Sequence, residues 1–157
     1  VRGPVVGIGM SIALCCDLVI ASETTRFSQI FRRIGLAPDG GAIWLLNHRL
    51  GMAKAKELVF TGRFVDAQEA LRMGLVSRVV AQERLMDEAR TIARRIAGNA
   101  PLSLLAAKRA VDELTKDRAD RDMGLVSEVS ARAMSSEDFK EGRRAFMEKR
   151  KPVWKGR

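Results

Sequence analysis

The 157-residue chain combines 46% hydrophobic with 30% charged residues and carries a formal net charge of +9. This composition and length are those of a globular protein that can bury one core, and no apolar run approaches the ~20 residues needed to span a bilayer. Two adjacent cysteines, Cys15 and Cys16, cannot readily bridge each other, and we expect both to be buried free thiols, which suits a reducing, cytoplasmic compartment.

The first eighty residues predict strands and helices in alternation. Val5 and Val6 end an extended segment, residues 9–16 form a short buried helix, and residues 18–21 are a continuous apolar run of strand length. We therefore expect a βαβ-like unit in a parallel sheet at the start of the chain.

Aspartate and glycine residues mark the boundaries of the next elements. One helix begins just beyond Asp39, and Asp66 is a suitable N-cap for another, which Gly74 ends. The predicted elements are helices over 40–50, 52–60 and 67–73 and a strand over 75–80.

From about residue 83 the pattern is helical throughout. Leu85, Ala89, Ile92 and Ile96 fall on one face of a helix that ends at Gly98-Asn99. Further helices are predicted over 102–114, 121–134 and 137–150. We therefore expect an α/β protein with two domains, an α/β core over 1–82 and a helical domain over 83–157, with no long linker between them.

Two short motifs could carry chemistry. Gly7-Ile8-Gly9 precedes the first predicted helix, where a glycine-flanked turn aims free backbone N–H groups outward and a helix start favours negative charge. Asp39 stands between Pro38 and two glycines, and it could move a proton while an oxyanion is held at the first motif. Each motif also has a purely structural explanation: the glycines can form a tight turn, and Asp39 can be the N-cap of the following helix.

The order and spacing of these motifs resemble the crotonase superfamily, the enoyl-CoA hydratase/isomerase family. The matching segments cover essentially the whole chain: residues 3–17 (GPVVGIGMSIALCCD), Phe27, 35–41 (GLAPDGG), 55–58 (AKEL), 61–63 (TGR), 66–70 (DAQEA), 74–76 (GLV), 136–139 (SEDF) and 148–152 (EKRKP). The resemblance implies a crotonase-like spiral core of ββα units followed by a helical C-terminal subdomain. Because the chain opens without a start signal, we expect it to be the C-terminal portion of a longer protein. The preceding half would supply several strands, much of the CoA pocket and the first oxyanion-hole N–H group.

The resemblance assigns roles to particular residues. Thioesters of CoA react at the α-carbon when preorganised N–H donors stabilise the negative charge on the carbonyl oxygen. The N–H of Ile8 matches the second oxyanion-hole position, and Gly7 and Gly9 would let the substrate approach closely. The two glutamates that position and activate water in enoyl-CoA hydratases are matched by Ser11 and Phe31. We therefore do not expect two-glutamate hydration, and Phe31 is expected to form an apolar wall of the substrate site.

Asp39 matches a position that carries a functional carboxylate in other branches of the family. In dienoyl-CoA isomerases, and in the ring-opening and double-bond isomerases of the phenylacetate pathway, this aspartate shuttles a proton. In 4-chlorobenzoyl-CoA dehalogenase it is the nucleophile. We expect Asp39 to lie in an apolar pocket, because desolvation favours the neutral form of a carboxyl group that must take and return one proton.

The positive charge is concentrated near the end of the chain. Residues 139–157 contain eight Lys or Arg against two Glu, which gives 8 − 2 = +6 of the total +9. A nucleic-acid-binding module is one interpretation, but no aromatic platform or helix-turn-helix signature accompanies the charge. The family resemblance gives another: the pattern from Phe146 to Pro152 lies near the CoA phosphates, with Lys149 as a substrate-binding residue.

These observations lead to one main functional hypothesis, an enoyl-CoA isomerase that uses Asp39 as the proton shuttle. The alternatives are an enoyl-CoA hydratase with a non-standard water-activating residue and a catalytically degenerate CoA-binding subunit. We expect an acyl-CoA substrate, no cofactor beyond the CoA that carries the acyl group, and no metal, nucleic-acid or membrane partner. Members of the family assemble as trimers that stack into hexamers, and the terminal helices carry apolar residues. We therefore expect a homotrimer or homohexamer.

Overall fold

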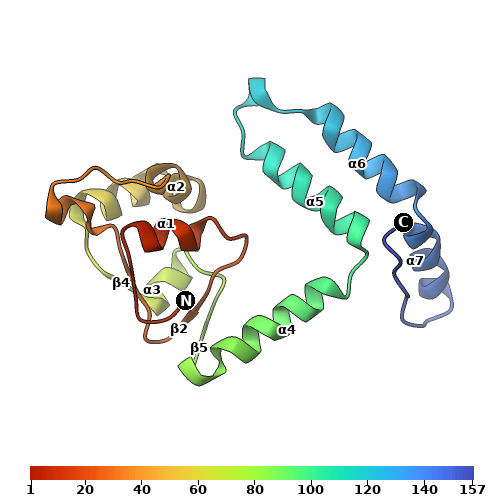
Figure 1. Ribbon diagram of the computed structural model, residues 1–157, viewed down its shortest axis with the longest axis horizontal. Coiled ribbons are helices and arrows are strands. Elements are labelled where there is room, and N and C mark those ends of the chain that lie inside the picture. Colours follow the sequence, from red (N-terminus) through yellow and green to blue (C-terminus); the bar gives the residue numbers. More distant parts are fainter. The chain divides into compact units, whose positions relative to one another are not determined.

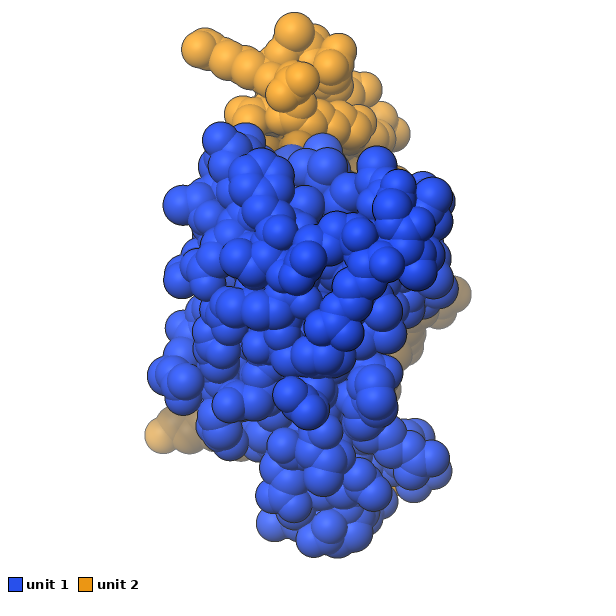
Figure 2. Space-filling model, turned by 90° about the vertical axis from the view of Figure 1, so that its left-hand side faces the viewer, with its two compact units in different colours: residues 1–90 blue, residues 91–157 orange.

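The computed structural model describes residues 1–157, which divide into two compact units, Val1–Arg90 and Thr91–Arg157. Figure 2 draws the two units in separate colours. The first unit contains all of the strands and the second is helical, as the sequence predicts for an α/β protein with a helical end. No helix is both long enough and apolar enough to cross a membrane.

The first unit contains two small sheets. Strands β1 (Pro4–Val6), β3 (Arg26–Ser28) and β4 (Val65–Asp66) form one sheet in the order β1-β3-β4, in which β1 and β3 are parallel and β3 and β4 antiparallel. Strands β2 (Ile20–Ser22) and β5 (Arg78–Val80) form a separate parallel pair.

The expected βαβ unit in one sheet is wrong, because β1 and β2, which are joined by helix α1 (Ile8–Leu14), lie in different sheets. A turn directly after β2 explains the difference. The Thr25 N–H donates to the Ser22 carbonyl at 3.0 Å, and the Ser22 hydroxyl is hydrogen-bonded to those of Thr24 and Thr25. The chain reverses there, so β3 rather than β2 becomes the neighbour of β1.

The helices of the first unit follow the local signals. Helix α2 (Ala42–Thr61) is broken at Gly51, which has φ 76° and ψ 164°, so the two helical segments predicted on either side of this residue are confirmed. Helix α3 (Ala67–Arg72) has the predicted N-cap, since the Asp66 carboxylate accepts the Glu69 N–H at 2.7 Å. β5 is shorter than the predicted strand, because Leu75 and Val76 belong to the buried core but are not paired in a sheet.

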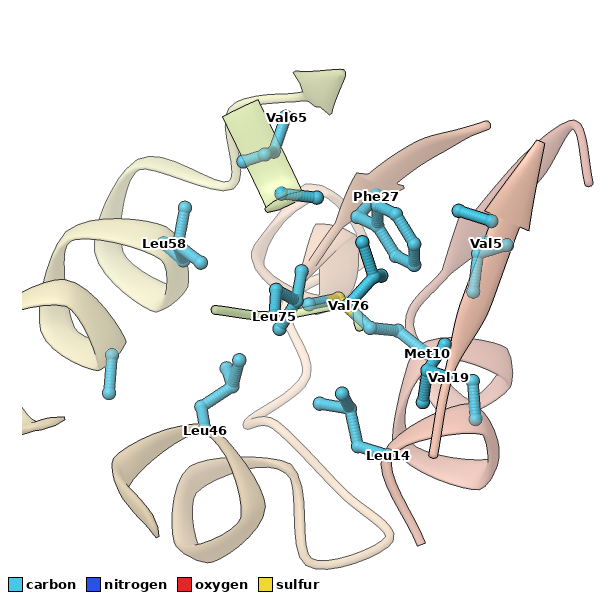
Figure 3. Packing of buried hydrophobic residues seen from close by; sticks show 14 residues of the cluster. Val5, Met10, Leu14, Val19, Phe27, Leu46, Leu58, Val65, Leu75 and Val76 are labelled. Carbon is cyan, nitrogen blue, oxygen red and sulfur yellow. The ribbon is translucent and has the colours of Figure 1, made fainter. Parts of the chain in front are cut away.

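The core of the first unit lies between α1, α2 and the strands. Figure 3 shows side chains from these elements converging on one cluster, with Phe27 from β3, Met10 and Leu14 from α1, and Leu46 and Leu58 from α2. Met10 and Leu14 are one turn apart, so they fix one face of α1 against the core and leave its other face exposed.

The expectation that the two cysteines are buried is wrong. Cys15 and Cys16 are both exposed free thiols. Helix α1 ends at Leu14, so Cys15 is its C-cap and Cys16 lies beyond it. Both side chains therefore fall outside the buried face that Met10 and Leu14 define.

The second unit consists of helices and a tail that folds back on them. Helix α4 (Leu85–Ala97) crosses the division between the units and is followed by α5 (Pro101–Leu114), α6 (Met123–Ser135) and α7 (Glu137–Met147). Helices α5 and α6 pack side by side (Figure 1). The buried Asp138 carboxylate accepts the N–H groups of Lys155 and Gly156 at 2.7 and 2.8 Å, which fixes the tail to α7.

Helix α7 is three residues shorter than predicted. Glu148 is its C-cap, and Lys149 has a left-handed φ of 54°, which ends the helix. Phe139 and Phe146 lie on this helix and are exposed in the described chain.

Candidate functional site

The N-terminus of α1 presents two unpaired N–H groups. Gly7, its N-cap, has φ 52°, and its own N–H donates to the Ser28 carbonyl at 2.9 Å. The Met10 and Ser11 N–H groups both donate to the Gly7 carbonyl, whereas those of Ile8 and Gly9 have no acceptor in the chain. Ile8 and Gly9 are also exposed, so their N–H groups can bind an external oxygen atom.

Glycine at position 7 is favoured by the backbone conformation. The φ of 52° disfavours residues with a Cβ atom. A Cβ atom at Gly7 would lie 3.7 Å from Cζ of Phe31, an ordinary packing distance, so the buried ring borders this turn without excluding a side chain from it. Gly9, by contrast, has nothing within 4 Å of its Cβ position, so the space beside it is open for a close approach.

The loop that carries Asp39 lies against the same end of α1. The Ser11 hydroxyl donates to the Asp39 carbonyl at 3.1 Å, and Ser11 itself is only 1% exposed. A Cβ atom at Gly40, where φ is 61°, would lie 2.2 Å from Cδ1 of Ile8 and 3.3 Å from Cβ of Ser11. The left-handed φ and the tight approach to the buried Ser11 both favour glycine at position 40, and this contact brings the Asp39 loop beside the Ile8 side chain.

The carboxylate of Asp39 is held by its own loop. Its Oδ1 accepts the Gly40 N–H at 2.6 Å, which leaves Oδ2 for another partner. The N-cap of α2 is Gly41, with no side-chain cap, so the interpretation of Asp39 as the N-cap is wrong.

The expectation of an apolar pocket around Asp39 is also wrong for this chain, in which the residue is exposed. The apolar side chains nearest to it along the sequence include Leu36 and Trp44, and both are more than half exposed themselves. Residues 1–157 therefore form only one side of the surroundings of Asp39, and its desolvation would require a further surface.

Other carboxylates of the first unit are engaged in structural ion pairs. Arg63 binds Glu57 at 2.7 Å and Glu69 at 2.6 Å. Hydrogen bonds from Lys54 and Arg63 lower the pKa of Glu57, and those from Arg63 lower the pKa of Glu69. Both glutamates stay ionised and join α2 to α3, so neither is suited to exchange protons at neutral pH.

The structure thus brings together five of the six predicted site residues, since Gly7, Ile8, Gly9, Phe31 and Asp39 gather around the start of α1. Lys149 belongs to the second unit. Its N–H donates to the Phe146 carbonyl at 3.2 Å, and its side chain is exposed and available to an anion.

Two features of this region were not predicted from the sequence. The side chain of Gln29 is buried, and neither its amide nitrogen nor its amide oxygen has a hydrogen-bond partner. Arg49 on α2 donates to the backbone carbonyls of Leu14 and Cys16, which attaches the C-terminal end of α1 to α2. No sequence pattern distinguishes either residue, because both features depend on segments that are far apart in the chain.

Comparison with known proteins gives a consistent result. The family model described as enoyl-CoA hydratase/isomerase matches residues 1–157. The chain is 41% identical over 161 residues to the carnitinyl-CoA dehydratase of Proteus mirabilis and 40% identical over 162 residues to that of Salmonella agona. In both cases all of this chain aligns with 62% of the relative, so the chain spans less than two thirds of the length of these relatives.

Solved structures agree with the sequence comparison. An enoyl-CoA hydratase subunit from Geobacillus kaustophilus superposes with a TM-score of 0.90 at 36% identity, over 99% of this chain and 60% of that one. An enoyl-CoA hydratase from Mycobacterium marinum superposes with a TM-score of 0.92 at 32% identity, over 99% of this chain and 62% of that one. With its motifs, its fold and these matches taken together, the chain belongs to the enoyl-CoA hydratase/isomerase family of the crotonase superfamily.

Proposed function

We propose that the full-length protein moves the double bond of an enoyl-CoA substrate, with Asp39 carrying the proton and the Ile8 N–H holding the enolate oxygen. One observation carries this proposal: the Asp39 loop packs on α1 through Ser11 and Gly40, beside an unpaired N–H group. The residues proposed as proton carrier and oxyanion donor thus belong to two segments that pack together at one end of α1.

The chemistry follows from these two groups. Asp39 removes a proton from C2 of a 3-enoyl-CoA, and the electron pair of the broken C–H bond moves onto the thioester as an enolate. The Ile8 N–H stabilises the negative charge on the enolate oxygen. The electrons then return to form the C2–C3 double bond, the C3–C4 double bond opens, and C4 takes the proton back from Asp39. Because Oδ1 is held by the Gly40 N–H, Oδ2 is the oxygen that exchanges the proton.

The two residues that match the water-activating glutamates support isomerisation over hydration. The hydroxyl of Ser11 is used in a hydrogen bond to the Asp39 loop, and the ring of Phe31 packs on Gly7. Neither side chain is a carboxylate that could deprotonate water. A second candidate function is nevertheless hydration or dehydration of an enoyl-CoA, since two similar proteins are named carnitinyl-CoA dehydratase. It would need a water-activating residue other than these two.

The rest of the substrate would be bound by backbone and by positive charge. Gly7 and Gly9 allow the thioester to approach the start of α1, and Phe31 contributes an apolar surface. Lys149 would pair with a CoA phosphate. The acyl group is carried by CoA itself, and none of these steps calls for another cofactor.

We further propose that the full-length protein is a homotrimer or homohexamer held together in part by its terminal residues. The exposed Phe139 and Phe146 supply apolar surface for such contacts. Deletion of residues 139–157 should lower the mass measured by light scattering, and an unchanged mass would refute this assignment.

The decisive test of the function is Asp39→Asn in the full-length protein. Asparagine keeps the size and polarity of the side chain but cannot accept the proton. Double-bond migration of a 3-enoyl-CoA should fall by ~10²–10⁴, with little change in affinity for the CoA ester. Glu23→Gln, which neutralises another exposed carboxylate of the first unit, is the matched control and should retain full activity.

Hydration of a 2-enoyl-CoA is measured beside isomerisation. Full isomerase activity in Asp39→Asn would eliminate Asp39 as the proton carrier. Hydration that outpaces isomerisation in the unmodified protein would favour the second candidate. Binding of acyl-CoA without turnover of either substrate would indicate a CoA-binding subunit that has lost catalysis.

A further inference from the structure

An uncharged groove of about 420 Å³ lies next to the Asp39 loop. It is lined by residues of the loop and of α2 on both sides of the break at Gly51, namely Pro38, Gly41, Ala42, Ile43, Trp44, Asn47 and Met52. None of these side chains is charged. Pockets of roughly 300–1,000 Å³ with mainly apolar walls are typical of sites for small organic ligands.

The groove begins beside the proposed proton carrier. Pro38 directly precedes Asp39, and successive Cα atoms are about 3.8 Å apart, so the groove wall includes the chain neighbour of Asp39. A substrate whose reacting carbons lie at Asp39 therefore has this wall within reach of the part of its acyl group beyond them.

Trp44 is the largest side chain of the wall and is held in place by His48. The centroids of the two rings are 3.9 Å apart, with an angle of 33° between their planes, and Nδ1 of His48 is hydrogen-bonded to the Trp44 carbonyl at 2.9 Å. His48 covers part of the indole ring, yet Trp44 remains 53% exposed. Ile43 and Met52 are exposed to a similar degree. A supported, exposed aromatic ring in an uncharged groove favours a flat apolar ligand.

We propose that this groove binds the distal part of the acyl group, and that Trp44 is a specificity-determining residue for CoA esters with a bulky apolar end, such as a phenyl ring. This inference rests on the proposed function, because it takes Asp39 to lie beside the reacting carbons. The uncharged wall offers no cationic side chain to pair with an acyl group that ends in a carboxylate.

The expected preference follows from the area removed from water. Burial of one CH₂ group raises affinity about fourfold at 25 °C, so a substituent the size of a phenyl ring gains far more from the groove than a short chain that ends before it. Removal of the indole ring should therefore weaken binding of the ring-bearing ester by roughly 10- to 100-fold. The affinity for a short-chain ester should change by less than about threefold.

The test measures binding apart from catalysis. Saturated esters, butyryl-CoA and 4-phenylbutyryl-CoA, have no double bond to move, so their dissociation constants report binding alone. In the full-length protein, Trp44→Ala should weaken only 4-phenylbutyryl-CoA, and Trp44→Phe should keep most of the affinity. Phe60→Ala removes another exposed aromatic side chain, near the C-terminal end of α2, and should change neither constant.

Fluorescence gives a second readout that keeps the Trp44 side chain intact. This chain has two tryptophans, so the emission that Trp154→Phe retains and Trp154→Phe/Trp44→Phe loses is that of Trp44, whatever tryptophans the rest of the full-length protein contains. Binding of 4-phenylbutyryl-CoA should change Trp44 emission more than binding of butyryl-CoA does. Equal changes for the two esters, or equal losses of affinity in Trp44→Ala, would overturn the proposal.

The outcomes separate this inference from the proposed function. Selective binding through Trp44 without turnover would keep the groove assignment and reject isomerisation. Isomerisation that is insensitive to Trp44→Ala would keep the proposed function and reject the groove assignment. If another part of the full-length protein covers the groove, Trp44→Ala will lower the melting temperature while acyl-CoA leaves Trp44 emission unchanged, and the groove assignment fails.

Discussion

Substitution of Gly40 tests whether the contact between the Asp39 loop and α1 positions the catalytic groups. In Gly40→Ala the new Cβ atom would lie 2.2 Å from Cδ1 of Ile8 and 3.3 Å from Cβ of Ser11. Gly35→Ala is the matched control, because Gly35 has a similar φ of 71° but nothing within 4 Å of its Cβ position. In both variants an alanine must adopt a left-handed backbone conformation, which lowers the free energy of unfolding by roughly 1–2 kcal/mol. The difference in stability and activity between the two variants therefore reports the contact with α1 alone.

The magnitude of that difference can be worked out from the contact atoms. Carbon atoms pack at about 3.5–4.0 Å, so Cδ1 of Ile8 must retreat by roughly 1.5 Å. Ile8 is 48% exposed and its terminal methyl can rotate, at a cost of about 0.5–1.5 kcal/mol. Ser11 is buried and cannot move away as freely, so part of the shift falls on the loop. We expect Gly40→Ala to be less stable than Gly35→Ala by about 1 kcal/mol, but to lose about 100-fold in kcat, because a displacement near 1 Å can have that effect.

The assay combines urea unfolding with isomerisation of a 3-enoyl-CoA for both variants of the full-length protein. Ile8→Ala provides a further control, since it removes the clashing methyl group and keeps the backbone N–H. In the Ile8→Ala background, Gly40→Ala should lose much less activity than it does alone. Equal kcat values for Gly40→Ala and Gly35→Ala, or no recovery with Ile8→Ala, would refute the idea that this contact positions Asp39.

Three further predictions concern neighbouring residues. Gln29→Met in the 157-residue chain should raise the free energy of unfolding by about 1 kcal/mol, because a buried amide without partners costs roughly 1–3 kcal/mol. A lower free energy of unfolding in urea would show that the amide is paired. Ser11→Ala should lower kcat by no more than about fivefold, the worth of one hydrogen bond of ~1 kcal/mol, and Phe31→Leu should likewise cost far less than Asp39→Asn. Arg63→Gln should destabilise the protein at pH 7 and much less at pH 3, because Arg63 lowers the folded-state pKa of Glu69. The stability that this ion pair adds is present above the ordinary glutamate pKa of 4.5 and is lost as the pH falls through the folded-state pKa. Destabilisation in thermal melts that does not depend on pH would contradict the assignment.

The sequence by itself determined the features that depend on nearby residues. The start of α3 follows from Asp66, whose carboxylate caps a backbone N–H three residues away, and the break in α2 follows from Gly51. The first turn of α1 likewise needs a glycine at position 7 because of its backbone conformation. Caps, breaks and turns involve bonds over a few residues, so the order of residue types is enough to predict them. The motifs around Gly7 and Asp39 also indicate the family without reference to the fold.

Only the tertiary structure decided the features that depend on residues far apart in the chain. An apolar strand pattern does not specify its partner, so the pairing of β2 with β5 rather than β1 could not be predicted. The exposure of the cysteines depends on where α1 ends against the core. The surroundings of Asp39 are set by its contact with Ser11, 28 residues away, and by the glycine that lets the loop approach Ile8. Such contacts form only when all the elements are packed together, because the position of each segment depends on the side-chain volumes and hydrogen bonds of the segments around it.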